Sequence, residues 1–238
     1  MAWSRMLAVL VAALALAGCY ETASDVPAIS DARRVAKSPF APGIWCSTDV
    51  SFDGAGAVTA VKLQDCFNVG FASGLLSVEK LHPDEDDRKE GPIVFAIAAL
   101  NRGASLLQTR NEVDKRYELY VATSRVDGIA VLPELKLTPG IVSEASALGI
   151  TIKKNVTNDD FRILSGQPDA VFKLIEHAAG SRFDDGVRDR ALWNEMMTKS
   201  FFFLPFKSDP KAVPPEPAAL VDQLERVRTG IRFAMTLE

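Results

Sequence analysis

Few residues in this chain can carry out covalent or metal chemistry. Its 238 residues include three cysteines, Cys19, Cys46 and Cys66, and two histidines, His82 and His177. A cysteine thiolate can accept a lipid or another sulfur, whereas histidine binds metals or transfers protons. The histidines are far apart, and neither has the short spacing to a second ligand that a zinc site needs. The sequence therefore predicts no catalytic residue, no metal and no cofactor.

Cys19 follows a segment that has the length of a signal-peptide core. Met6 to Ala17 is apolar and Arg5 precedes it. A transmembrane helix needs about 20 apolar residues, so residues 1–18 are predicted to be a signal peptide. The segment ends in Leu16-Ala17-Gly18-Cys19. This pattern resembles the lipobox of bacterial lipoproteins, and the resemblance covers only this end of the chain.

The lipoprotein resemblance implies a covalent anchor on Cys19. In that family the thiol receives a diacylglycerol, the signal peptide is removed just before the cysteine, and the new amine often carries a fatty acid such as palmitate. Each buried methylene contributes about 0.8 kcal/mol, so two or three chains anchor a protein stably. Tyr20 stands where an aspartate would retain enterobacterial relatives at the inner membrane. The expected location is the periplasmic face of the outer membrane; a plain signal peptide with an incidental cysteine is the alternative.

Residues 19–42 are predicted to form a flexible tether. They contain Pro27, Pro39 and Pro42 and no sustained apolar period. A coil of this length spans roughly 25 Å, enough to lift a domain clear of the head groups.

Cys46 and Cys66 are predicted to form a disulfide. An isolated pair usually closes in an oxidising periplasm, and the loop of about 20 residues would contribute about 3 kcal/mol. Two buried free thiols are the alternative.

Residues 43–155 are predicted to form a β-rich domain. Short runs rich in β-branched and aromatic residues alternate with turn residues. Asp127-Gly128 is a typical hairpin turn between two of these runs. Successive hairpins predict an antiparallel meander, either a curved sheet or a barrel. The expected strands lie in 43–48, 57–67, 92–100, 105–110, 116–124, 128–135 and 148–154.

Residues 156–238 are predicted to be a mixed α+β part that packs against the first or forms a second subdomain. An amphipathic helix is expected over 165–180, ended by Gly180 and with His177 in its last turn. A second is expected over 216–230, with Leu220, Val221, Leu224 and Val227 on one side. Residues 185–199 suit either a helix or two strands. A core strand is expected at 201–206 and a closing strand at 231–238.

Two further motifs suggest functions. Ser77-Val78-Glu79-Lys80 resembles the serine–lysine signature of penicillin-binding enzymes, but the middle motif of that family is missing. Gly43-Ile44-Trp45 is similar to the first-strand motif of lipocalins, in which the tryptophan closes the barrel floor. The helical C-terminal third departs from the lipocalin plan.

Charge and composition exclude other roles. The net charge is −4 and the charges of both signs are dispersed, so no nucleic-acid partner is expected. The acidic stretch 82–92 lacks the alternate spacing and glycine of a calcium loop and is expected to be a solvated loop. We therefore expect a non-catalytic, membrane-anchored protein that binds an envelope protein or has a structural role. A carrier of a small apolar ligand is the first alternative, and a serine hydrolase the second.

Overall fold

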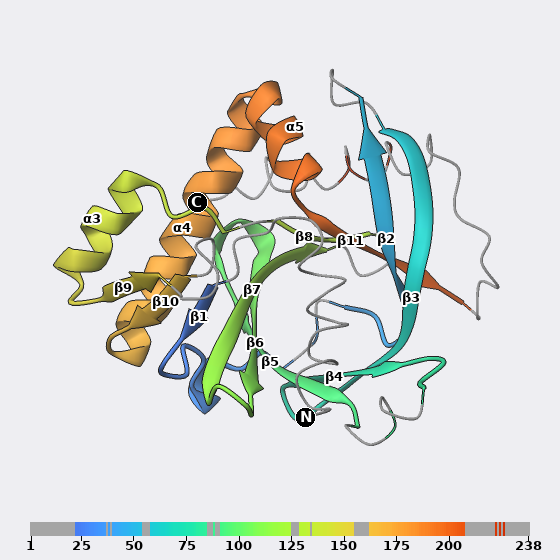
Figure 1. The fold of residues 1–238 in the computed structure, drawn as a ribbon, viewed down its shortest axis with the longest axis horizontal. Coiled ribbons are helices and arrows are strands. Elements are labelled where there is room, and N and C mark those ends of the chain that lie inside the picture. Colours follow the sequence, from blue (N-terminus) through green and yellow to red (C-terminus); the bar gives the residue numbers. More distant parts are fainter. Residues whose placement is uncertain are drawn as a thin grey trace.

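The computed structural model describes residues 22–36, 38, 40–53, 58–84, 88, 91–124, 129–133, 135–154 and 162–207, and residues 222, 224 and 226. Within these ranges the chain forms eleven strands and three α-helices, which confirms the predicted α+β class. Figure 1 shows the strands with the helices on one side of them.

Eight strands form a closed antiparallel barrel. They are β2 (Gly43–Phe52), β3 (Val58–Ala72), β4 (Leu75–Lys80), β5 (Ile93–Ala99), β6 (Ala104–Asn111), β7 (Arg116–Ser124), β8 (Ala130–Leu132) and β11 (Phe201–Phe206). Their order is β6-β5-β4-β3-β2-β11-β8-β7, and the pairing of β6 with β7 closes the ring. Every neighbouring pair is antiparallel. The predicted meander is therefore confirmed, and it closes instead of remaining an open, curved sheet.

The last strand of the ring comes from the C-terminal third of the chain. β11 lies between β2 and β8, where Phe202 pairs with Thr48 on one side and with Val131 on the other. The core strand predicted at 201–206 is confirmed. Without it, β2 and β8 would each have an open edge.

Three further strands extend the sheet beyond the barrel. β1 (Thr22–Ser24) pairs antiparallel with β7 and parallel with β10 (Arg162–Ser165), and β10 pairs antiparallel with β9 (Thr151–Lys154). Neither β1 nor β10 was predicted from the sequence, because each strand is too short to show a clear pattern. Their stability comes from pairing with residues distant in the chain.

The segment predicted as a tether is largely part of this fold. Ala23, Ala28 and Ile29 are buried, and Phe40 is buried inside the barrel. Arg33 is stacked over the ring of Phe172 at 4.1 Å. The expectation of a flexible tether is thus wrong for the described residues from Thr22 to Pro42. The apolar residues here have no period because each packs against a different distant element.

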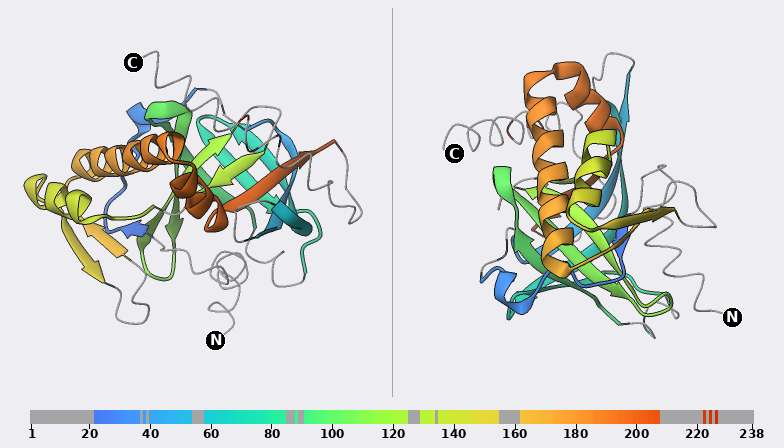
Figure 2. Two further views of the ribbon diagram at one scale, coloured as in Figure 1. Left: turned by 90° about the horizontal axis from the view of Figure 1, so that it is seen from above. Right: turned by 90° about the vertical axis from the view of Figure 1, so that its left-hand side faces the viewer.

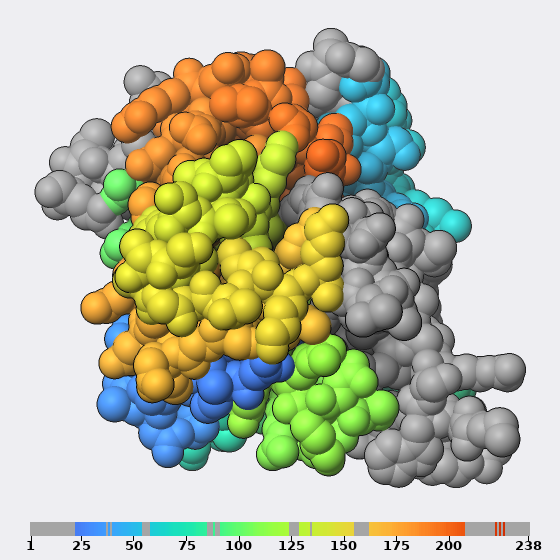
Figure 3. Space-filling view, turned by 60° about the vertical axis from the view of Figure 1, so that its left-hand side comes forward, coloured from blue at the N-terminus to red at the C-terminus, as the bar shows by residue number. Residues whose placement is uncertain are grey.

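The helices cover the outer side of the sheet. α3 (Pro139–Ala147), α4 (Pro168–Arg188) and α5 (Arg190–Thr198) contribute to one large apolar core with the outward-facing side chains of the barrel. Both views in Figure 2 place α4 and α5 along one side of the strands. Figure 3 shows the same side of the molecule, with α3 above β10 and β1. The barrel interior is therefore separate from the helical core.

Two helix predictions need correction. α4 continues past Gly180 to Arg188, because Phe183 and Val187 extend its buried stripe by two more turns. That burial outweighs the cost of about 1 kcal/mol for a glycine inside a helix. α3, which the sequence did not predict, begins at Pro139, and its first turn is capped by the Thr138 hydroxyl accepting from Ile141 N–H.

Other predictions are confirmed or lie outside the described residues. The ambiguous segment 185–199 is helical, as the end of α4 and α5. The Asp127-Gly128 turn is outside the described residues, although the two strands it joins pair as expected. The closing strand at 231–238 and most of the helix at 216–230 also lie outside them. Asp222, Leu224 and Arg226 are described as helical, with Leu224 buried.

Candidate functional site: the barrel interior

Strand alternation divides the barrel side chains between two cores. Leu106, Val121 and Val131 point outward to the helices, whereas their chain neighbours point inward. The inward core contains Phe40, Trp45, Leu76, Ile97, Leu107, Ala122 and Ala130. Because Ala122 and Ala130 are small, they leave space at the centre.

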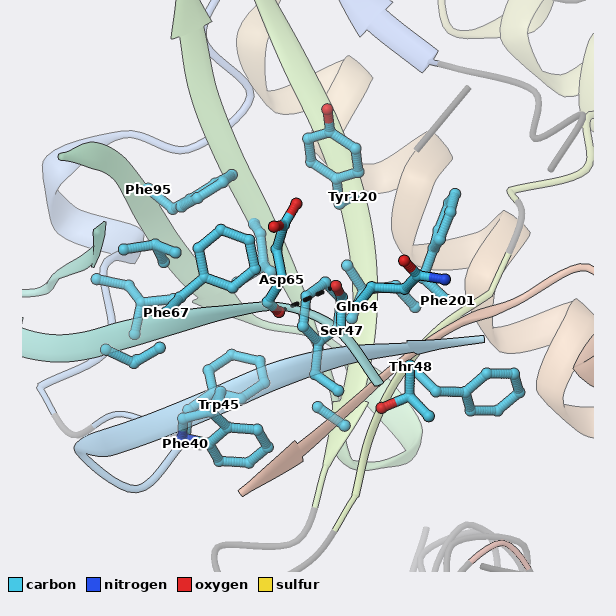
Figure 4. Close-up of a pocket in the computed structure, with 18 of the residues that line it drawn as sticks. Phe40, Trp45, Ser47, Thr48, Gln64, Asp65, Phe67, Phe95, Tyr120 and Phe201 are labelled. Atoms are coloured by element: carbon cyan, nitrogen blue, oxygen red, sulfur yellow. Dashed lines mark hydrogen bonds between the residues drawn. The ribbon is translucent and has the colours of Figure 1, made fainter. Parts of the chain in front are cut away.

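This space is a cavity of about 380 Å³. Its wall is largely apolar, and Figure 4 shows its side chains converging from the surrounding strands. Such a volume and lining are typical of a small-molecule pocket. The lining residues are Phe40, Trp45, Ser47, Thr48, Asp49, Gln64, Asp65, Phe67, Val69, Leu76, Val78, Phe95, Leu107, Tyr120, Ala130, Leu132, Phe201, Phe202 and Phe203.

Aromatic side chains form the framework of the wall. Phe40 and Trp45 meet edge to face with ring centroids 5.9 Å apart, and Phe95 and Tyr120 do so at 6.2 Å. Trp45 donates its indole N–H to the backbone oxygen of Ala41 at 2.8 Å. These contacts hold the rings in place, so the wall is preformed.

A β-bulge creates the polar part of the lining. Cys46 pairs with Cys66 but Thr48 pairs with Leu63, so β3 has one extra residue between these pairs. A bulge interrupts the alternation of side chains. As a result, the consecutive residues Gln64 and Asp65 both line the cavity.

The polar side chains here lie at the solvent-facing part of the cavity. Asp49 and Gln64 are exposed, and the Gln64 amide donates to the Asp49 carboxylate at 2.7 Å. The Ser47 hydroxyl donates to the backbone oxygen of Asp65 at 3.1 Å, drawn as a dashed line in Figure 4. Thr48 is buried and its hydroxyl donates to the backbone oxygen of Cys46. An apolar interior therefore opens through a polar mouth on β2 and β3.

The predicted disulfide lies beside this mouth but on the opposite face of the sheet. Cys46 and Cys66 are bonded and are direct partners across β2 and β3, so this prediction is confirmed. Their chain neighbours Trp45 and Phe67 point into the cavity. The disulfide thus joins the two strands next to the bulge. Because side chains alternate along a strand, it lies on the face of the sheet opposite the cavity.

The serine–lysine hypothesis gains no support from the structure. Ser77 and Lys80 both lie on β4, and residues three apart on a strand point to opposite faces. Lys80 is the cross-strand partner of Phe67 on the cavity side of the sheet, and its Nζ lies 3.4 Å from Asp65 Oδ1. The hydroxyl and the amine therefore do not converge.

His177 lies in the middle of α4, not in its last turn as predicted, and pairs with Glu144 of α3. Among the described residues, no group of three or more His, Cys, Asp or Glu could hold a metal ion. The acidic stretch 82–92 falls partly outside the described residues.

Among the lining residues, Trp45 is the one that a sequence motif singles out. Alternation along β4 to β7 could have identified Leu76, Phe95, Leu107 and Tyr120 as one face. The mouth residues Gln64 and Asp65 could not be found this way, because the bulge breaks the pattern.

In the described part of the chain, no helix is long and apolar enough to span a membrane. Comparisons of this chain with protein-family models, with curated proteins and with solved structures find no match.

Proposed function

We propose that this chain is a membrane-anchored periplasmic lipoprotein whose barrel binds a small, largely apolar ligand. The observation that carries the binding role is the cavity of about 380 Å³ with its aromatic wall and polar mouth. A solid barrel core would have favoured a purely structural role or a flat protein-binding surface instead. The carrier therefore takes precedence over the partner-binding role that the sequence alone favours.

The anchoring part of the proposal rests on Leu16-Ala17-Gly18-Cys19. A lipid on Cys19 would hold the barrel at a bilayer, which is a source and an acceptor of apolar molecules. The proposed site is the inner face of the outer membrane. The disulfide supports an oxidising compartment such as the periplasm.

Filling the cavity should abolish binding. Val78 of β4 lines the cavity, whereas Val94 of β5 is 43% exposed and lies opposite Ser77 on the outer face. Val78→Phe should raise the Kd for a neutral naphthylamine probe by about tenfold or more, because the ring occupies the ligand's space. Val94→Phe adds the same atoms outside the barrel and should leave the Kd unchanged. The measurement is a fluorescence titration of each variant, with circular dichroism to verify folding. Equal affinity in both variants would place the binding site elsewhere.

Removing the thiol of residue 19 should remove the anchor. In Cys19→Ser no thioether to a diacylglycerol can form, so the protein should lose metabolic labelling with an alkyne-tagged palmitate and should remain uncleaved or mislocalised. Cys46 and Cys66 serve as the internal control, since a disulfide cannot accept lipid. A Cys19→Ser protein of mature size in the membrane fraction would contradict the lipoprotein assignment.

A further inference from the structure

We infer that the ligand of this cavity is a small amphiphile whose polar end donates hydrogen bonds, as an alcohol or an amine does. The inference rests on the proposed binding function and adds the chemical class of the ligand. It comes from the charges and hydrogen-bonding groups at the mouth.

The charged groups in the cavity lining are all carboxylates. Asp49 and Asp65 line the cavity, and among the described residues no lysine or arginine does. Figure 4 shows the Asp65 carboxylate directed away from its strand into the space between Phe67 and Tyr120. Asp65 therefore presents acceptor oxygens to anything that occupies the cavity, and a carboxylate without a proton cannot donate.

Two lysines lie close to these carboxylates without lining the cavity. Lys80 Nζ is 3.4 Å from Asp65 Oδ1, and Lys62 is the cross-strand partner of Asp49. They keep the mouth from being strongly negative. A ligand's carboxylate in the cavity would nevertheless face the two lining carboxylates, whereas neither ammonium is part of the lining, and like charges repel. A hydroxyl or an ammonium would instead donate to the same oxygens.

The remaining groups at the mouth agree with this preference. The hydroxyl hydrogens of Ser47 and Thr48 and one of the two amide hydrogens of Gln64 are already directed to protein oxygens. Their unused capacity is mainly as acceptors, because each hydroxyl and the amide oxygen retains lone pairs. A ligand that donates is therefore better matched than one that only accepts.

The volume limits the apolar part of the ligand. At about 30 Å³ for each water-sized group, the 380 Å³ cavity holds roughly a dozen non-hydrogen atoms. This suits a chain of about ten carbons or a small ring system.

The test compares three ligands that share a decyl chain: decanol, decylamine and decanoate. Each displaces the naphthylamine probe from the full chain carrying Cys19→Ser, produced without lipid and oxidised to form the Cys46–Cys66 bond. Decanol and decylamine should compete at concentrations about tenfold below that of decanoate. The same titrations with Val78→Phe, in which the cavity is filled, measure any binding outside the cavity.

Variants at the mouth then assign the selectivity. Asp65→Asn, alone and with Asp49→Asn, should reduce the preference for decanol and decylamine over decanoate by about threefold or more, because the charges that repel decanoate are removed. Asp185→Asn, which removes a carboxylate on α4 outside the barrel, should leave the preference intact. Decanoate binding as tightly as decanol to a protein that binds the probe would overturn the ligand class alone. A protein that binds neither the probe nor any decyl ligand would overturn the proposed function.

Discussion

Glu195 of α5 is the residue at which cations from three places in the chain converge. Its Oε1 lies 3.5 Å from Lys136, 3.7 Å from Arg182 and 3.6 Å from Lys199. Partial burial acts to raise the pKa of the Glu195 carboxyl, but Lys136, Arg182 and Lys199 outweigh it and hold that pKa below the ordinary value of 4.5. The residue thereby joins α5 to α4 and to the segment before α3.

This arrangement predicts a pH-dependent contribution to stability. A carboxyl whose pKa is lower in the folded state stabilises the protein above its unfolded pKa, and the contribution disappears as the pH falls through the folded pKa. Glu195→Gln should therefore lower the free energy of unfolding at neutral pH by about 1 kcal/mol or less, since solvent screens half-exposed pairs.

Urea denaturation of both proteins from about pH 7 to about pH 3 measures the effect. The difference between them should be constant above the ordinary glutamate pKa and should shrink below it. Since every other carboxyl is common to the two proteins, the general effect of acid cancels. A difference that grows as the pH falls would contradict the assignment.

At the scale of elements, the β2–β3 hairpin combines a covalent link with an irregular register. The disulfide joins Cys46 to Cys66, and the bulge follows directly. The bond restricts the two strands where the ladder of backbone hydrogen bonds is interrupted. Because the bulge aims Gln64 and Asp65 at the mouth, this hairpin positions the polar part of the site.

Removing the disulfide should destabilise the protein measurably. The double variant Cys46→Ala/Cys66→Ala should lose about 3 kcal/mol of unfolding free energy, since the unfolded chain regains the entropy of a 20-residue loop. At about 2–4 °C per kcal/mol for a chain of this size, the Tm should fall by about 6–12 °C. Thermal unfolding followed by circular dichroism gives both values.

The wild-type protein treated with reductant is the matched control, because it loses the bond and keeps both sulfurs. It should unfold at nearly the same temperature as the double variant. An unchanged Tm in both samples would show that the hairpin does not depend on the bond.

The elements that were predictable are those stabilised by local signals. β7 and the hairpin with β8 follow from residue type and turn chemistry, and the start of α4 follows from Pro168, Asp169 and the apolar spacing after them. β1, β4 and β10 were missed. β1 and β10 are three or four residues long. β4 contains Ser77 and Lys80, which were considered as a catalytic pair and not as alternating side chains of a strand.

At the scale of the whole molecule, the chain closes its barrel late. Seven of the ring strands lie between Gly43 and Leu132, and the eighth, β11, begins at Phe201. The cavity exists only once that strand is in place, since Phe201, Phe202 and Phe203 line it. Neither closure nor cavity could be established from the sequence, because both depend on β11 pairing with β8 and β2, which end about 70 and about 150 residues before it.

A fragment of residues 43–155, the predicted β-rich domain, should therefore not fold alone. It would expose one edge each of β2 and β8 and would lose α4 and α5, which share the outer core with Leu106, Val121 and Val131. The expected result is an uncooperative thermal transition and no probe binding.

Co-expression of residues 20–155 with residues 156–238 should restore both properties, because the pair supplies β1, Phe40, β11, α4 and α5. Such a rescue would show that the fragment 43–155 fails to fold because elements are missing and not because the truncation damages it. Cooperative unfolding and probe binding by 43–155 alone would contradict the interdependence and support two subdomains.

Because β1 begins at Thr22, the distance between the barrel and Cys19 is limited. Thr22 is already paired with Leu119 and Arg162, so three Cα–Cα steps, through Tyr20 and Glu21, separate Cys19 from a fixed strand. Even fully stretched, they reach about 10 Å. Should Cys19 carry the proposed lipid, the barrel would rest on the surface of its own leaflet and could not cross the periplasm. Cargo would then be exchanged over molecular distances, with that leaflet or with a protein that comes to it, and delivery to the opposite membrane would require a second carrier.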